Sequence, residues 1–255
     1  MPVEQKKQEE TNFWDKVAGE RIYAAFSEKQ YNEIFNENLN GFSTGAALDI
    51  GCASGVSAVL LSQRGLKVKG IDMSPKLVEQ ARRLWSNNSN APEFIVGDAE
   101  HLPIETESCN ICFLGGVLHH FPNYQKVIDE VFRVLKERGI VLMVEPNLLD
   151  VIERASWFFA GKLKLLAPSE YPVSPYAVKE GLSPKFENFK MYPIRTDDIP
   201  FFSFIPYLGK FFKGGKGKPI KKIPLFFLNL FRPKLHRGNF FVLSCTKRKL
   251  THERP

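Results

Sequence analysis

The sequence lacks the features that would place the protein in a membrane or outside the cell. No apolar run reaches about 18 residues, the length a transmembrane helix needs. Residues 1–11 are polar and charged, so they hold no apolar stretch of a signal peptide and are expected to be a disordered tail. Four cysteines in 255 residues are too few for a disulfide framework. We therefore expect a protein of the reducing cytoplasm.

Acidic residues are missing from one long stretch, Ile199 to Thr251. This stretch contains twelve Lys and Arg residues, more than the net charge of +7 for the whole chain, so the remainder of the chain is net acidic. It also holds 10 of the 22 Phe residues. The basicity therefore belongs to one C-terminal segment, the basic aromatic segment, and not to the whole surface.

Three interpretations of the basic aromatic segment are open. It can be a lid that packs over the core with a solvated basic rim. It can contact an anionic membrane surface, with Phe inserted and Lys on lipid phosphates, which would give a cytoplasmic protein associated with the membrane surface. It can contact nucleic acid by stacking and phosphate binding, which ranks below the membrane contact. Nothing in the sequence predicts the oligomeric state.

Apolar runs alternate with amphipathic stretches through the first part of the chain. Alternating strands and helices with short joins predict a parallel sheet covered on both faces. Residues 12–38 read as helical, and four prolines between 167 and 188 predict loops there. The predicted strands are 46–50, 66–71, 93–96, 110–114, 139–145, 186–195 and 239–246, and the predicted helices are 56–64, 75–86, 123–137 and 148–165.

A glycine turn follows the first predicted strand, with the pattern Asp49-x-Gly51-x-x-x-Gly55. A dinucleotide fingerprint would need glycine at Ala53 and Val56, and the Gly-Lys-Ser/Thr ending of a phosphate-binding loop is absent. The turn therefore suits a smaller ligand whose amino-acid portion approaches the backbone at the start of the next helix.

Two further acids follow the next predicted strands. Asp72 ends the second strand and can accept hydrogen bonds from both hydroxyls of a ribose. Asp98 follows the third strand and can contact an adenine edge. Because the carboxyl ends of parallel strands share one edge, these acids and Asp49 are expected to lie together where open α/β sheets bind ligands.

With these motifs in order over residues 46–146, the chain resembles the class I S-adenosylmethionine-dependent methyltransferases, in particular the branch that methylates small molecules. The resemblance implies a Rossmann-like, doubly wound, seven-stranded sheet with only the last strand antiparallel. It also implies S-adenosylmethionine as the methyl donor. The pieces that carry the resemblance are Leu48-Asp49-Ile50-Gly51-Cys52-Ala53-Ser54-Gly55, Gly70-Ile71-Asp72-Met73-Ser74, Gly97-Asp98-Ala99-Glu100-His101-Leu102-Pro103, Val117-Leu118-His119-His120-Phe121 and Arg133-Val134-Leu135-Lys136-Glu137-Arg138-Gly139.

The same resemblance implies where the donor would lie. Its methionine moiety would be near the glycine turn, its ribose on the second acid, and its adenine between the residues after the second and third strands. The chain departs from the family where Ala53 replaces a frequent glycine and Asn110 replaces a frequent aspartate. The predicted cofactor-binding residues are Asp49, Gly51, Cys52, Ser54, Gly55, Asp72, Met73, Asp98, Ala99 and Gly115.

Three residues are candidates for catalysis. His119 and His120 follow the fourth strand, on the loop that would face the reactive end of the donor, and a histidine there can act as a general base. Glu145, at the end of the fifth strand, can bind or deprotonate a substrate. The alternatives are that the histidines only pack or cap the loop and that Glu145 is solvated.

No metal site is predicted. Cys109 and Cys112 form a C-x-x-C pair, but no second pair offers zinc ligands. In a regular strand, positions i and i+3 point to opposite faces, so we expect two buried cysteines without redox or metal function.

The sequence therefore predicts transfer of a methyl group to a small or lipid-linked acceptor. One rival is an RNA methyltransferase that uses the basic aromatic segment, although Leu114-Gly115-Gly116-Val117 differs from the Asn/Asp-Pro-Pro-aromatic motif of adenine-amino methyltransferases. The other rival is a protein that binds S-adenosylmethionine without catalysis. The predicted organisation is a tail (1–11), helices and donor-binding core (12–147), an acceptor lid or insertion (148–238), and a final core strand with its tail (239–255).

Overall fold

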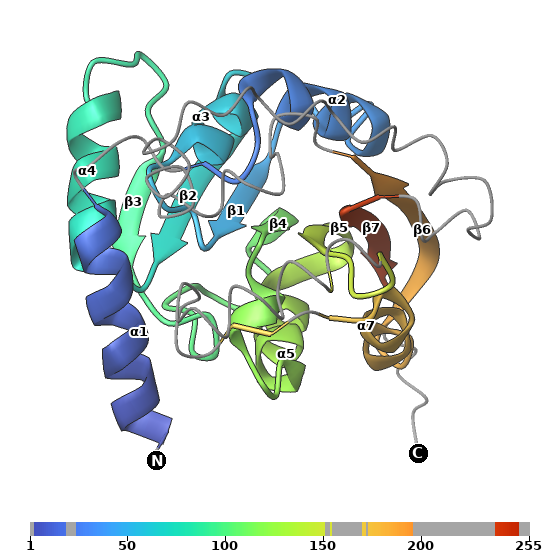
Figure 1. Cartoon of the computed structure of the whole chain (residues 1–255). Coiled ribbons are helices and arrows are strands. Elements are labelled where there is room, and N and C mark those ends of the chain that lie inside the picture. Colours follow the sequence, from blue (N-terminus) through green and yellow to red (C-terminus); the bar gives the residue numbers. More distant parts are fainter. Residues whose placement is uncertain are drawn as a thin grey trace, which may run out of the picture.

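One seven-stranded sheet forms the centre of the computed structural model, which describes residues 3–18, 24–150, 154, 170–171, 173–195 and 238–249 (Figure 1). The strand order is β3-β2-β1-β4-β5-β7-β6. β7 pairs antiparallel with both of its neighbours, and all other pairs are parallel, which confirms the predicted topology. The strands are β1 (Ala46–Ile50), β2 (Lys67–Asp72), β3 (Glu93–Val96), β4 (Cys109–Gly115), β5 (Leu135–Pro146), β6 (Phe186–Ile194) and β7 (Phe240–Lys247).

Helices cover both faces of the sheet. One face packs against α5 (Gln125–Val134) and α7 (Pro175–Leu182), and the other packs against α2 (Glu28–Asn38), α3 (Val56–Ser62) and α4 (Pro75–Trp85). The central strands are buried on both faces, which is why their sequences are almost continuously apolar.

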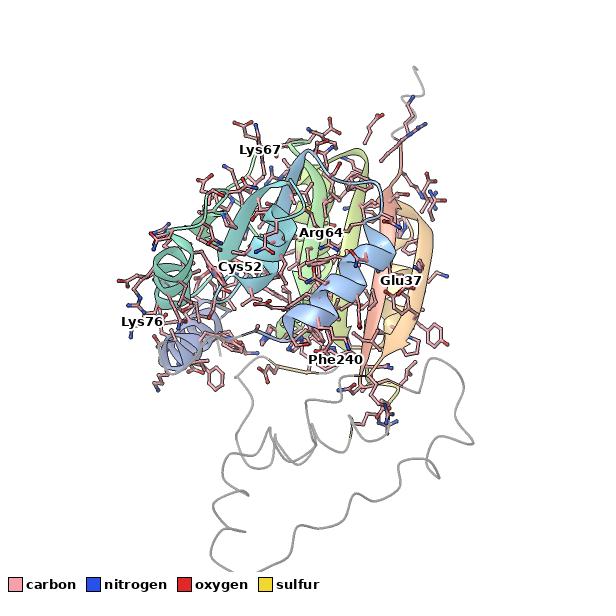
Figure 2. The ribbon with its side chains drawn as sticks, turned by 90° about the horizontal axis from the view of Figure 1, so that it is seen from above. Glu37, Cys52, Arg64, Lys67, Lys76 and Phe240 are labelled. Carbon is pink, nitrogen blue, oxygen red and sulfur yellow. The ribbon has the colours of Figure 1, made fainter. Side chains whose placement is uncertain are left out.

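Side chains along β1 alternate between the two faces of the sheet. Leu48 and Ile50 belong to the core beneath α5, whereas Ala47 belongs to the core beneath α3. Successive residues of a strand point to opposite faces, so Asp49 shares the face of Ala47 and lies toward α3. Lys67, at the start of β2, and Phe240, at the start of the antiparallel β7, lie at opposite edges of the sheet (Figure 2).

Local sequence explains where two helices begin and end. Ser74 caps α4 because its Oγ accepts a hydrogen bond from Leu77 N at 3.1 Å, and Pro75 occupies the first turn. The helix predicted over 123–137 corresponds to α5 and buries its apolar face, but it ends at Val134. β5 begins at the next residue, so the predicted strand was too short at its start.

The prediction of a disordered tail over residues 1–11 was wrong. Helix α1 (Val3–Val17) occupies that stretch and packs beside α4 (Figure 1). Asp15 of α1 accepts a hydrogen bond from Ser74 Oγ at 2.5 Å, and Glu10 of α1 is only 3% exposed. Polar contacts with the core therefore help to hold this helix in place.

Part of the predicted lid over 148–238 belongs to the core instead. Residues 175–182, predicted as loop, form α7, because Pro175 occupies the first turn of a helix, where no backbone N–H is needed. β6 then forms the edge of the sheet. The predicted helix over 148–165 and the basic aromatic segment lie largely outside the described residues. No helix within the described ranges is both long and apolar enough to span a membrane.

The two cysteines of the C-x-x-C pair meet, contrary to the expectation of opposite faces. Both are buried, as predicted, and so are Cys52 and Cys245. However, the register of β4 shifts between Cys109 and Ile111, which breaks the regular alternation of side chains. A hydrogen bond from the Cys112 thiol lowers the pKa of Cys109 to about 7, helped by Ser108 and nearby lysines and opposed by burial.

Candidate functional site

The glycine turn joins β1 to α3 at the carboxyl edge of the sheet. Gly51 and Gly55 have φ angles of +70° and +82°, in the left-handed region that favours glycine. A Cβ atom at Gly51 would lie 2.6 Å from a Val117 methyl group. Ala53, where the related family often has glycine, also has a positive φ of 46°. The turn therefore needs small residues to hold this shape.

Asp72 ties the glycine turn to the end of β2. One carboxylate oxygen accepts a hydrogen bond from Ala53 N at 2.9 Å, and the other accepts from Ser74 N at 2.9 Å. Burial raises the pKa of Asp72, and these two backbone donors partly oppose the shift. Each carboxylate oxygen has a second lone pair, so Asp72 can still accept two hydroxyl groups.

Asp49 lies beneath the start of α3. Its Oδ2 accepts a hydrogen bond from Ser57 Oγ at 2.6 Å, whereas its Oδ1 is buried and has no hydrogen-bond partner. Burial raises the pKa of Asp49 to about 7, although the Ser57 hydroxyl opposes the shift. A buried carboxylate oxygen with no donor is suited to a cationic group of a ligand.

Two of the other predicted donor residues turn their side chains away from the edge. Ser54 is fully buried and donates a hydrogen bond from Oγ to Gln80 of α4 at 3.1 Å. Cys52 is buried, and its sulfur would lie 3.0 Å from a Cβ at Gly70. Both residues can present only backbone atoms to a ligand. Gly115 closes β4, and Met73 follows β2 directly.

Asp98 follows β3 and contacts helix α1. Its Oδ1 accepts a hydrogen bond from Glu100 N at 2.9 Å, and its Oδ2 lies 2.5 Å from Lys7 Nζ. Burial raises the pKa of Asp98, but the Lys7 and Glu100 contacts outweigh it and hold the pKa below its usual range. Lys7 also contacts the Glu100 carboxylate at 2.5 Å. Ala99 therefore lies between two residues that contact Lys7 of α1.

Glu145 organises the loop after β4. It is fully buried, so the alternative of a solvated acid was wrong. Its Oε1 accepts hydrogen bonds from Val117 N at 2.9 Å and Leu118 N at 2.8 Å, and its Oε2 lies 2.9 Å from His119 Nδ1. Because the carboxylate only accepts, the His119 proton is assigned to Nδ1, and the neutral ring carries a lone pair on Nε2.

His120 is surrounded by residues that the sequence did not single out. Its Nδ1 lies 2.9 Å from Glu10 Oε1 and 4.0 Å from Glu170 Oε1. The Trp14 ring meets the His120 ring edge to face at 5.5 Å, and Trp14 Nε1 donates to Glu10 Oε1 at 3.0 Å. Glu10 lies in the stretch predicted as a tail, Trp14 in the stretch predicted as helical and Glu170 in a stretch predicted as loop, so no local pattern could have indicated that they meet.

Tyr171 is a further residue that the sequence missed. Its backbone N–H donates to the His119 carbonyl at 2.8 Å, so it lies against the loop after β4. Its hydroxyl is buried without a hydrogen-bond partner. Burial raises its pKa to about 12, with contributions from Tyr124 and Glu145.

Buried polar atoms without partners gather at this edge. Among the described residues there are three: Asp49 Oδ1, His120 Nδ1 and Tyr171 OH. Buried polar groups are nearly always hydrogen-bonded, so each exception calls for an explanation. The edge thus offers a cation acceptor at the glycine turn and two polar groups beside the loop after β4.

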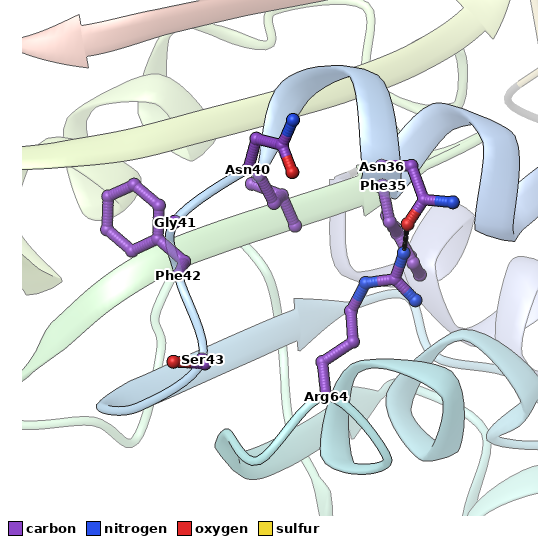
Figure 3. A pocket seen from close by; sticks show the side chains of 8 residues that line it. Phe35, Asn36, Asn40, Gly41, Phe42, Ser43 and Arg64 are labelled. Carbon is purple, nitrogen blue, oxygen red and sulfur yellow. Dashed lines mark hydrogen bonds between the residues drawn. The ribbon is translucent and has the colours of Figure 1, made fainter.

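A cavity of about 300 Å³ lies elsewhere, at the amino edge of the sheet (Figure 3). It lies between the end of α2 and Arg64, which follows α3. Arg64 donates to Asn32 Oδ1 at 2.8 Å and also contacts the side chain of Asn36, so its charge is used within the protein. None of the predicted site residues lines this cavity.

The chain is similar to known methyltransferases in sequence. The family model "Methyltransferase domain" matches residues 48–143. Arsenite methyltransferase of Halobacterium salinarum is 32% identical over 112 residues, which cover 42% of this chain and 27% of the relative. Demethylmenaquinone methyltransferase of Oceanobacillus iheyensis is 29% identical over 153 residues, which cover 55% of this chain and 64% of the relative. The chain thus spans less than two thirds of either relative.

A solved structure shares the fold over most of the chain. Phosphoethanolamine N-methyltransferase 2 of Haemonchus contortus, in complex with S-adenosylmethionine, superposes with a TM-score of 0.62 and 18% identity. The match covers 87% of this chain and 53% of that one. The strand order and the glycine turn agree with the family match over residues 48–143, and the chain is similar there to the class I S-adenosylmethionine-dependent methyltransferases.

Proposed function

We propose that this protein transfers a methyl group from S-adenosylmethionine to a small molecule. The single observation that carries the proposal is the set of three buried polar atoms without a hydrogen-bond partner at the carboxyl edge of the sheet. One of them belongs to the glycine turn, where the family binds the donor. The other two belong to His120, on the loop after β4, and to Tyr171, which packs against that loop. An acceptor would meet the donor there.

The residues present fit the donor. Asp49 Oδ1 is a buried acceptor without a partner and suits the ammonium group of the methionine moiety. Gly51 and Gly55 let the backbone approach at the N-terminus of α3, which has no side-chain cap. Asp72 would accept both ribose hydroxyls, and Asp98 with Met73 and Ala99 would contact the adenine. When bound, S-adenosylmethionine supplies an electrophilic methyl group on its sulfonium.

His119 and Glu145 support proton removal from the acceptor. The Glu145 carboxylate holds the His119 proton on Nδ1 at 2.9 Å, which orients the ring and leaves Nε2 as the basic nitrogen. An acceptor hydroxyl or amine would lose its proton to that nitrogen. Glu145 would stabilise the resulting imidazolium, as a buried carboxylate does for a histidine base.

Positioning carries the remaining part of the catalysis. Methyl transfer is an in-line displacement, so holding the acceptor on the axis of the breaking bond supplies most of the rate advantage. Trp14, Tyr171 and His120 would enclose the acceptor, and α1 closes this edge against water through Lys7 and Glu10. A lipid-linked acceptor and an anionic membrane contact stay predictions that rest on the composition of the basic aromatic segment.

The direct test is incubation of the full chain with a small-molecule extract and methyl-labelled S-adenosylmethionine, followed by mass spectrometry. We expect one small molecule to gain the labelled methyl group. Donor binding without label in any compound would instead favour a protein that binds S-adenosylmethionine without catalysis. Label in RNA, with salt-dependent RNA binding, would favour the nucleic-acid alternative.

Donor affinity should fall as the pH drops below about 7. In the free protein the buried Asp49 has a pKa raised to about 7, so below that pH it must lose a proton before it can pair with the donor's cation. Calorimetry in buffers of different ionisation enthalpy should therefore detect close to one proton released per donor at about pH 6, where the amino group of the donor is already charged. Asp49→Asn should abolish this proton release, and a release that persists in the variant would contradict the assignment.

The raised pKa of Asp49 also predicts how the folding stability of the donor-free protein changes with pH. The folded protein binds the Asp49 proton more tightly than the unfolded chain does, so this residue costs stability progressively as the pH rises from about 4 to about 7. Asp49→Asn should flatten the stability profile over that range, as measured by chemical denaturation.

A further inference from the structure

Two histidines and a carboxylate form a cluster that the sequence did not predict as a metal site. One ring nitrogen each of His119 and His120 and a carboxylate oxygen of Glu170 lie within 4.8 Å of one another. The histidines are consecutive in the 3-10 turn η1 (Leu118–His120), and their ring centroids are 4.1 Å apart. Imidazole and carboxylate together are ligands that zinc-like divalent ions prefer.

The first histidine is oriented as metal-bound histidines usually are. Glu145 accepts at His119 Nδ1, which fixes the tautomer and leaves the lone pair on Nε2. Carboxylate–histidine–metal arrangements of this kind hold the ring in place and raise its basicity as a ligand. Glu145 is itself buried and held by hydrogen bonds from two backbone N–H groups, so the orientation of the His119 ring is fixed by the core.

The second histidine makes a close contact that is not a hydrogen bond. His120 Nδ1 lies 2.9 Å from Glu10 Oε1, yet this nitrogen has no hydrogen-bond partner. Two ligand atoms bound to one ion at about 2.1 Å point at the ion, and they lie about 3.0 Å apart at a right angle and about 3.4 Å apart at the tetrahedral angle. The distance of 2.9 Å between His120 Nδ1 and Glu10 Oε1 is close to the first of these separations.

The cluster is shielded from bulk water and carries a negative surplus. The side chains of His120, Glu10 and Glu170 are only 14%, 4% and 11% exposed. Two carboxylates here face two imidazoles, and Asp72 lies close enough to interact electrostatically with His120. A buried group of acids and neutral imidazoles is stabilised by a bound cation.

We propose that His119, His120 and Glu170 bind one divalent ion of the zinc type, with Glu10 beside His120 as a fourth ligand. The site lies next to the predicted reactive end of the donor, so its use in catalysis rests on the proposed function. An ion there would bind an acceptor hydroxyl or amine and lower its pKa, and His119 would then act as a ligand instead of a base.

The test uses the full chain freed of metal with a chelator and then dialysed against Zn²⁺ or Co²⁺. We expect one ion per chain by elemental analysis, and visible absorption bands from bound Co²⁺. His120→Asn and Glu170→Gln should each weaken Zn²⁺ binding at least about 100-fold. His101→Asn is the matched control, because this histidine is 74% exposed and outside the cluster, and it should bind Zn²⁺ as the unmodified chain does.

Two results would overturn the proposal. One is an absence of bound Zn²⁺ and Co²⁺ in a chain that still binds S-adenosylmethionine, which shows that the fold and donor site are intact. The other is undiminished Zn²⁺ binding in both His120→Asn and Glu170→Gln. Zn²⁺ binding that depends on these residues supports the site even if no acceptor is methylated, and in that case only the proposed function fails.

Discussion

Asp72→Ala should lower the affinity for S-adenosylmethionine at least about 100-fold. The predicted role of Asp72 is to accept two hydroxyl groups of the donor, and hydrogen bonds to a charged acceptor contribute about 1.5–3 kcal/mol each. The carboxylate is buried and held by two backbone donors, so its position is fixed before the donor arrives. Titration calorimetry measures the loss, and unchanged affinity would remove the basis of the donor site.

The control must separate a lost contact from a disturbed helix start. Ser74→Ala removes the cap of α4 two residues after Asp72 but no predicted donor contact, and it should cost about 1 kcal/mol of folding stability. Its donor affinity should stay within about threefold of the unmodified chain. If Ser74→Ala loses as much affinity as Asp72→Ala, the effect of Asp72 is structural.

Glu145→Ala should lower the free energy of unfolding by about 3 kcal/mol or more. It leaves three buried donors without an acceptor, two backbone amides and His119 Nδ1, and each costs about 1–3 kcal/mol. Such a loss is a large fraction of the stability of a typical domain. Urea denaturation measures it. Glu137→Ala, an exposed glutamate of the same strand, should change stability by less than about 0.5 kcal/mol.

Glu145→Gln separates folding from catalysis at the same position. The amide oxygen can still accept from Val117 and Leu118, so the loss of stability should be smaller than for Glu145→Ala. The amide nitrogen would face His119 Nδ1 and move the ring proton to Nε2, which removes the basic nitrogen. Nitrogen NMR of the imidazole should report the change of tautomer together with lost methyl transfer. Full activity with the changed tautomer would exclude His119 as the base.

The central part of the fold could be predicted because local signals there agree with one another. Continuous apolar runs marked β4 and β5, and Ser74-Pro75 marked the start of α4. The order of the motifs indicated which strand ends meet, so Asp49, Asp72 and Asp98 could be expected at one edge. These positions depend on short stretches of chain, which is why the sequence alone was enough.

The remaining features depend on contacts between distant parts of the chain. Helix α1 has few buried apolar residues, and Lys7 and Glu10 hold it against loops about a hundred residues away. Glu170 and Tyr171 lie in a proline-rich stretch with no period, yet they pack against the loop after β4. The register shift in β4 joins two thiols that regular alternation would separate. None of these features has a local signature.

The antiparallel strand β7 has one more consequence. β6 ends at Ile194 and β7 begins at Phe240, and these two residues are paired across the sheet at the edge that carries the donor site. The sheet therefore holds the two ends of the stretch between them side by side. The length and composition of that stretch can change without altering any strand pairing, so this part of the chain is free to vary while the sheet is retained.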